Sequence, residues 1–406
     1  MNIPDSGYTD HHTHPASRCR ILTECDARSA KTWDEARILV DAHIAANPSR
    51  DLYVVHGWNQ ATWGTPTVAD LDAITDKEII VINVSYHGAL LNTVAAEKFP
   101  GTLVPSGSEH ANGTKVPGNS GNLVSEKDFE ELAIATLPKY DDLLVAIPKY
   151  HAYLSSLGVV AAHDMHLATM DQIDAYVELD RRGELAIDTT AFVNPRLLDE
   201  PRLAEIVENP SPRFRVAGLK LFLDGAIGVH TAFVTEPYLD THGHGMLRHS
   251  KDECVALIKK SLALGLATPA IHAIGDAAVS TVLDVYEELK ADGHDTNGWR
   301  IEHCEMVRPN DIPRIVALGA VPVMQPNFHW DLDHYGDRLG DNLRLINPFR
   351  PLLDAGVTIL FGSDGMPEGP KVGIEYAMNR ARFPEQTITL EEALTAYGIK
   401  SSFPSS

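Results

Sequence analysis

Short apolar segments alternate with longer amphipathic segments along most of the chain. This order is typical of a parallel sheet whose strands are joined by crossover helices. Eight apolar segments predict strands over residues 7–12, 157–163, 185–193, 216–223, 265–271, 298–303, 319–325 and 356–362. Helices are predicted between them over residues 169–182, 198–208, 251–264, 276–292, 309–317 and 348–355. Eight strands in 406 residues predict an α/β fold of the (β/α)8 TIM-barrel class.

The segment between the first two predicted strands is much longer than a crossover requires. It contains strand-like pieces at 51–57 and 79–84, a loop rich in Gly, Ser and Asn at 101–122, and a helical piece near 125–136. We interpret residues of about 45–140 as an insertion that caps the pocket, within a single barrel domain of residues 1–406. In the alternative interpretation, residues 51–57 are themselves a barrel strand.

Composition excludes several classes of partner. Hydrophobic residues make up 44% and charged residues 22% of the chain, and its net charge is −22. A strongly acidic protein repels the phosphate backbone, so we expect no nucleic-acid partner. No apolar run is long enough to span a membrane, and no secretory signal is visible, so we expect no membrane association and a cytoplasmic location. We expect a small-molecule substrate, and a homodimer stays open beside a monomer.

Polar residues recur where the predicted strands end. The first strand ends in Asp10-His11-His12-Thr13-His14, and alternation along a strand points His12 and His14 to the same side. In barrels, active sites gather at the carboxyl ends of the strands. The candidates at these ends, which together predict a metal site, are His12, His14, Lys220, His272, His303 and Asp364.

Several longer motifs resemble the amidohydrolase superfamily, in the branch that contains the N-substituted formamide deformylases. The motifs are DHHTHP at 10–15, GLKLFLDGAIGVHTA at 218–232, AIHAIGDAAV at 270–279, RIEHCEMV at 300–307 and LFGSDGMP at 360–367. The resemblance extends over essentially the whole chain. It implies a metal-dependent hydrolase with a binuclear centre of two divalent ions. Members also carry a small β-sandwich domain at the chain ends, and from this sequence we expect that domain to be absent.

The resemblance also implies roles for the individual ligands. His12, His14 and Asp364 would hold one ion, and His272 and His303 would hold the second. A carbamate formed from carbon dioxide on Lys220 would bridge the two ions. Imidazole, carboxylate and carbamate ligands suit zinc best, with iron, manganese and cobalt as alternatives.

Lys220 decides between one metal ion and two. It lies in an apolar run, where a charged ammonium is costly unless it has a partner. The alternative to the carbamate is a buried ion pair, with Asp224 as its partner.

Further residues are candidates for catalysis or substrate binding. Asp364 is the expected proton carrier, and His87 is a candidate donor to the oxyanion, although a structural role is an alternative for His87 and for His56. Trp58, Glu126 and Asp224 are the candidates around the substrate, with core packing as an alternative for Trp58 and a role in orienting the ligands for Glu126 and Asp224.

The resulting hypothesis is hydrolysis of an amide-like C–N bond in an N-acyl or N-formyl amine, by attack of a hydroxide that bridges two metal ions. One alternative is a deaminase-type hydrolase with a single metal ion. Another is a catalytically silent regulatory protein that binds metal.

Overall fold

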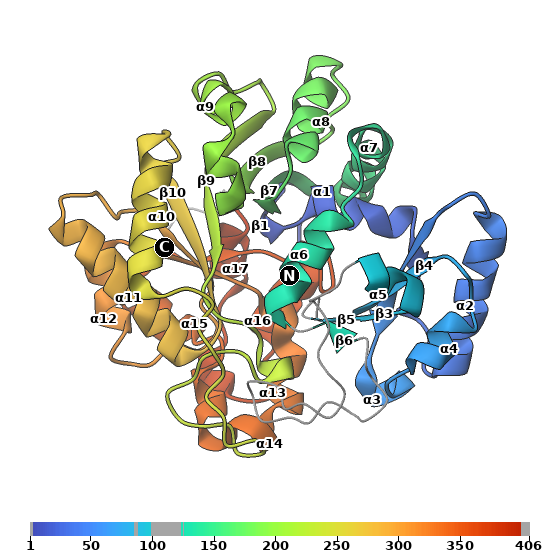
Figure 1. The fold of residues 1–406 in the computed structure, drawn as a ribbon. Helices are drawn as coiled ribbons and strands as arrows, with labels where there is room; N and C mark the ends of the chain where they lie inside the picture. The colour runs from blue at the N-terminus through green and yellow to red at the C-terminus, as the bar shows by residue number, and fades with distance from the viewer. Residues whose placement is uncertain (1–2, 85–87, 99–122, 125, 399–406) are drawn as a thin grey trace. The chain divides into compact units, whose positions relative to one another are not determined.

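The computed structural model divides into two compact units, each with its own β-sheet (Figure 1). The first unit comprises Met1–Arg18 and Lys139–Ser406, and the second comprises Cys19–Pro138. No helix among the described residues is both long and apolar enough to cross a lipid bilayer. The structure describes residues 3–84, 88–98, 123–124 and 126–398.

The first unit is an eight-stranded sheet of parallel strands in the order β1-β7-β8-β9-β10-β11-β12-β13, counted over the described residues. Each of the eight predicted strand segments overlaps one of these strands, and the nearly closed sheet confirms the (β/α)8 barrel. The strands are β1 (Tyr8–Thr13), β7 (Val159–Leu167), β8 (Asp188–Val193), β9 (Phe214–Phe222), β10 (Thr268–Ala273), β11 (Arg300–His303), β12 (Val321–Met324) and β13 (Leu360–Phe361).

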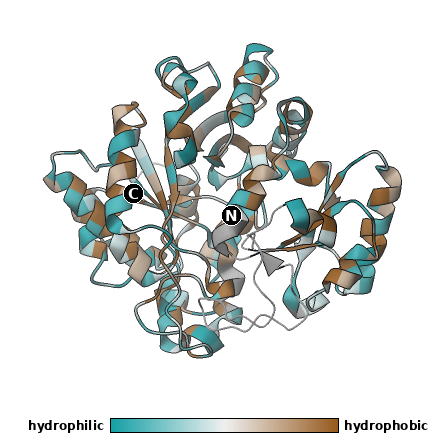
Figure 2. Cartoon of the chain, in the orientation of Figure 1, coloured by the Kyte–Doolittle hydropathy of each residue, from teal (hydrophilic) through white to brown (hydrophobic). Residues whose placement is uncertain are grey.

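Helices surround this sheet, and most of them bury one apolar face. In α11 (Asp276–Ala291), the buried Val279, Leu283 and Tyr286 recur every three to four residues, as a helix packed on a sheet requires. Figure 2 shows the same mixture of hydrophobic and hydrophilic positions on the other helices. These are α1 (Pro15–Arg18), α7 (Tyr140–Ser156), α8 (Met170–Arg181), α9 (Pro201–Glu208), α10 (Lys251–Ala263), α12 (Ile312–Leu318), α13 (Asp331–His334), α14 (Gly336–Leu339), α15 (Phe349–Asp354), α16 (Pro370–Met378) and α17 (Leu390–Ala396).

The barrel closes at a seam where the end of β13 approaches β1. The backbone N–H of Asp364 donates to the carbonyl of His12 at 2.7 Å. Buried Asp10 accepts hydrogen bonds from the backbone N–H and the hydroxyl of Ser363, at 2.9 and 2.6 Å. Gly362 permits the close approach, because a Cβ atom there would lie 2.3 Å from the backbone nitrogen of His12. The first and last barrel strands are therefore joined by direct contacts at the level of the predicted metal ligands.

The second unit is a smaller mixed sheet in the order β2-β3-β4-β5-β6. Its β3 (Leu52–Trp58) pairs in parallel with β2 and β4, so residues 51–57 do not form a barrel strand. The unit begins at Cys19, earlier than the expected boundary near residue 45, because β2 and α2 also belong to it. Its other elements are β2 (Cys25–Asp26), β4 (Glu78–Asn83), β5 (Ala89–Leu91), β6 (Leu123–Val124), α2 (Trp33–Ala46), α3 (Gln60–Trp63), α4 (Val68–Asp72), α5 (Thr93–Lys98) and α6 (Glu126–Ala135).

We predict that Gly362→Ala destabilises the barrel, because the added methyl group meets backbone atoms that cannot rotate away. Overpacking of this kind costs about 1–3 kcal/mol in the free energy of unfolding, which denaturant titration measures. Gly336→Ala is the control, since its Cβ would meet only the tip of Arg382 at 3.5 Å. Equal stability of the two variants would contradict the role of the seam.

Candidate metal centre

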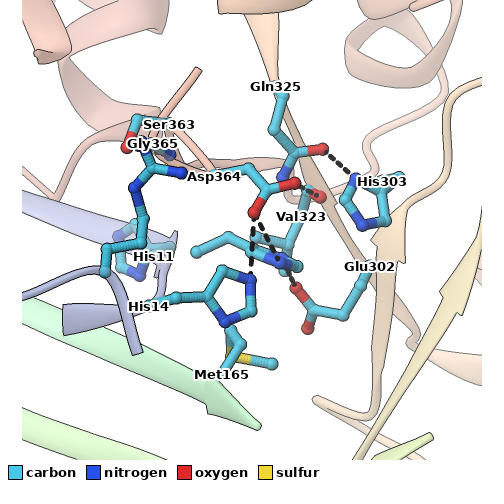
Figure 3. Close-up of polar contacts among 12 residues, drawn as sticks. His11, His14, Met165, Glu302, His303, Val323, Gln325, Ser363, Asp364 and Gly365 are labelled. Atoms are coloured by element: carbon cyan, nitrogen blue, oxygen red, sulfur yellow. Dashed lines mark hydrogen bonds and ion pairs between the residues drawn. The ribbon is translucent and has the colours of Figure 1, made fainter. Parts of the chain in front are cut away.

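Four histidines, each in or directly after one of three barrel strands, form a continuous row at the carboxyl ends of those strands. The ring centroids of His14 and His12 lie 5.3 Å apart, those of His12 and His303 4.7 Å, and those of His303 and His272 4.4 Å. Asp364 closes the row at the His14 end, where its Oδ1 lies 3.0 Å from His14 Nε2 (Figure 3). The same oxygen lies 3.8 Å from His12 Nε2. The structure thus brings together five residues that the sequence analysis proposed as ligands.

Irregular backbone directs these side chains. Between the paired positions Asp10–Ala162 and Thr13–Asp164, β1 advances by three residues while β7 advances by two. The regular alternation of side chains along β1 is therefore interrupted beside His12. His303 and Asp364 have positive φ angles of 66° and 50°, a region that costs energy for residues other than glycine. Such strained positions cluster where a site requires a side chain to leave the regular pattern of its strand.

Each of the three buried imidazoles has a hydrogen-bond acceptor behind it. His12 Nδ1 lies 2.5 Å from Glu302 Oε2, and His303 Nδ1 lies 2.7 Å from Gln325 Oε1. His272 Nε2 lies 3.0 Å from the carbonyl of Gly225. A proton on each of these nitrogens leaves the lone pair of the other ring nitrogen available to a metal ion.

Lys220 lies on β9 with its side chain fully buried. Its Nζ is 4.7 Å from the centroid of the Phe222 ring, and that ring is 5.2 Å from the ring of His272. Burial lowers the pKa of both His12 and His303, and the positive charge of the nearby Lys220 ammonium adds to this lowering. Lys220 therefore belongs to the same buried neighbourhood as the histidine row.

Burial and neighbouring charges set the ionisation of the ligands. Burial is the main cause that holds the pKa of His12 and of His303 well below the ordinary value of a histidine. Burial opposes ionisation of Asp364, but the hydrogen bond from His14 and the nearby charges outweigh it and lower the pKa of this carboxyl group. Neutral imidazoles and an ionised carboxylate are the forms that coordinate divalent cations.

These residues fit a divalent metal ion. Ligand atoms of His12, His303 and Asp364 lie within 4.8 Å of one another, a grouping found among the described residues. His12 Nε2 is buried and has no hydrogen-bond partner in the described part of the chain, which is costly for a polar atom unless it has another ligand. This group of three includes His303, which the resemblance assigns to the second ion. The residues expected to hold the two ions therefore form one row.

The candidates around the substrate are placed differently. Asp224 is fully buried and accepts hydrogen bonds from the backbone N–H groups of Phe233, Ile274 and Gly275, with Oδ1 3.5 Å from His272 Nε2. This placement fits a residue that orients the loop around His272, and it leaves no surface of Asp224 for a substrate.

Trp58 is 4% exposed within the hydrophobic core of the second unit, and its indole N–H donates to the carbonyl of Gly64 at 2.8 Å. Trp58 therefore packs in the core, which was the alternative to a place around the substrate. His56 is buried with its Nε2 2.6 Å from Glu24 Oε2, a contact that fits the structural alternative for this residue. His87 lies outside the described residues, as does the side chain of Glu126, the first residue of α6.

Sequence reasoning missed the residues that hold the ligands, chiefly Arg300, Glu302 and Gln325. Arg300 and Glu302 stand two positions apart in the buried strand β11, and such a spacing places both side chains on one face. Two charged residues on one face of a buried strand are the signal that could have identified them.

The fold and the donor set define a class: barrels that present a histidine and carboxylate metal site at the carboxyl ends of their strands. A sequence profile described as the amidohydrolase family matches residues 6–403, so the chain belongs to that family. It is a metal-dependent hydrolase of the amidohydrolase superfamily.

Known proteins resemble the chain over nearly its whole length. A Bacillus subtilis (strain 168) protein named as an amidohydrolase, YtcJ, is 24% identical over 94% of this chain and 74% of its own length. The N-substituted formamide deformylase of Arthrobacter pascens is 23% identical over 98% of this chain and 79% of its own. The crystal structure of an uncharacterized metal-dependent hydrolase from Pyrococcus horikoshii superimposes with a TM-score of 0.79 at 27% identity, over 97% of this chain and 79% of that one.

We predict that a divalent metal ion raises the thermal midpoint of metal-free protein, and that Asp364→Asn removes most of this rise. A ligand that binds only the folded protein stabilises it by about 4 kcal/mol at a thousand times its Kd. Asp354→Asn is the control, because the side chain of Asp354 is 67% exposed and lies outside the row. An unchanged metal-induced rise in the Asp364→Asn variant would argue against Asp364 as a ligand.

Proposed function

We propose that the protein hydrolyses an amide-like C–N bond in a small N-acyl or N-formyl amine, with two divalent ions, most suitably zinc, held along the histidine row. The observation that carries the proposal is the continuous row itself, which is longer than one ion needs and has Lys220 buried beside it. The Arthrobacter pascens relative, named for the deformylation of N-substituted formamides, supports this choice of substrate class.

The ligands divide by their place in the row. His12, His14 and Asp364 would hold one ion and His272 and His303 the other, with a carbamate on Lys220 between them. The carbamate forms when the neutral amine of Lys220 attacks carbon dioxide, which makes an N–C bond and releases one proton. Bound ions would lower the pKa of water towards neutrality and polarise the substrate carbonyl.

The chain's own residues would handle the proton. Asp364 is ionised, as its lowered pKa requires, and its side chain is 15% exposed, so both water and substrate can reach it. Asp364 accepts the proton of the attacking water and returns it to the leaving nitrogen, which departs as a neutral amine. His14 Nε2 lies 3.0 Å from Asp364 Oδ1, so the two groups already face each other where they would share an ion.

A deaminase-type reaction with a single ion is the second candidate. The compact group of His12, His303 and Asp364 favours it, because those three residues alone could hold one ion. Lys220 separates the two candidates, since a bridging lysine is needed only where two ions bind.

The test is a panel of N-formyl and N-acyl amines, assayed for release of the amine with zinc-reconstituted protein and with Lys220→Ala. We expect turnover by the unaltered protein, and a loss of about 100–1,000-fold in the rate for Lys220→Ala, comparable with the removal of other charge-stabilising groups. Elemental analysis should find about two ions per chain in the unaltered protein. A short carboxylic acid should restore part of the lost activity, because its carboxylate can stand in for the carbamate.

Lys251→Ala is the matched control, because the Lys251 side chain is 43% exposed and pairs with Glu288 on the surface. Full activity of Lys220→Ala would rule out the bridge. Release of ammonia from ring substrates, with no cleavage of acyl amines, would favour the single-ion deaminase.

A further inference from the structure

The acceptors behind the three buried imidazoles differ in charge. His12 is hydrogen-bonded to a carboxylate, that of Glu302, whereas His303 faces the side-chain amide of Gln325 and His272 faces a backbone carbonyl. The row therefore has a charged acceptor behind His12 and a neutral one behind His303. Behind His272 the acceptor is the carbonyl of Gly225, with the Asp224 carboxylate 3.5 Å from the same nitrogen.

Glu302 is bound by an arginine through both of its carboxylate oxygens. Arg300 contacts both of its oxygens, with Nε 2.6 Å from Oε1 and Nη2 3.1 Å from Oε2. The side chains of Arg300 and Glu302 are 5% and 0% exposed, so this is a buried bidentate pair.

Arg300 is itself fixed in place by the barrel interior. Its Nη2 donates to the carbonyl of His11 at 2.6 Å, and its Nη1 lies 2.6 Å from His163 Nδ1. Its guanidinium carbon lies 4.5 Å from the centroid of the Phe192 ring. The carboxylate behind His12 is thus a rigid, preorganised group.

Gln325 is equally well oriented but neutral. Its Nε2 donates to the carbonyl of Val323 at 3.2 Å, which turns Oε1 towards His303 Nδ1 (Figure 3). Both imidazoles are therefore held in the same tautomer, with Nε2 available to a metal ion. The main difference between the two acceptors is one negative charge.

A carboxylate that accepts the N–H of an imidazole makes the opposite nitrogen a stronger donor to a metal ion, and such partners change metal affinity by about 10–100-fold. We propose that Glu302 is a positioning residue that makes the His12 end of the row the tighter metal position, while Gln325 leaves the His303 end weaker. The chain would then keep one ion firmly and exchange the other. This proposal rests on the two-ion function proposed above.

The experiment titrates metal-free protein with zinc in competition with a chromophoric chelator. The unaltered protein should bind two ions of unequal affinity. Glu302→Gln should weaken the tighter position by about 10–100-fold and leave the weaker one within about twofold. Gln325→Glu should tighten the weaker position by about tenfold, an effect that a merely structural role of Gln325 would not produce.

The controls separate folding from metal affinity. Glu302→Asp keeps the charge and should retain more of the affinity than Glu302→Gln, and Glu288→Gln removes a carboxylate that is 38% exposed on the surface. Thermal melts of each metal-free variant report folding independently of metal. If Glu302→Gln does not fold, the gain of affinity in Gln325→Glu decides the question.

If folded Glu302→Gln, or Gln325→Glu, binds both ions with affinities within twofold of those of the unaltered protein, the proposed roles of Glu302 and Gln325 are wrong, while the two-ion function stands. Saturation of the unaltered protein at one ion would overturn the two-ion function, and with it the proposed difference in affinity between two metal positions.

Discussion

The close approach of the last barrel strand to the first is the constraint on which the site depends. Where β13 meets β1, the N–H of Asp364 donates to the carbonyl of His12, and Gly362 leaves no side chain to separate the two strands. Buried Asp10 reinforces this seam through Ser363. His12 and Asp364 belong to opposite ends of the chain. Their separation is therefore determined by backbone hydrogen bonds rather than by the rotamers of exposed side chains.

Around this seam, the protein surrounds neutral imidazoles with fixed partners. Burial keeps His12 and His303 uncharged, and the acceptors behind them select which ring nitrogen keeps its lone pair. The ionised Asp364 supplies negative charge at one end of the row. Such an arrangement is costly for the isolated protein, because the buried His12 Nε2 has no hydrogen-bond partner among the described residues, and a bound cation would remove that cost.

The eight strands and the candidate ligands at their ends could be predicted from the sequence, because each follows from the local pattern of its own strand. His12 and His303 are found from the position of each relative to its own strand, without knowledge of the other. Glu302 could not be assigned to His12 in this way, since the two residues are 290 positions apart and meet only after the barrel closes. The boundary at Cys19 was missed for a similar reason, because β2 is two residues long and is defined by its pairing with β3. Trp58 shows the opposite case, in which residue type alone could not distinguish a pocket wall from core packing.

The most direct test of the account is a crystal structure of zinc-loaded protein with anomalous diffraction measured on both sides of the zinc edge. The account predicts two anomalous peaks along the row, one beside His12, His14 and Asp364 and one beside His272 and His303, with additional density on the Lys220 amine between them. Ligand distances should be about 2.0–2.2 Å, as is usual for zinc with nitrogen and oxygen ligands. Zinc bound elsewhere, or a row of histidines that stays free of metal in zinc-replete crystals, would contradict it.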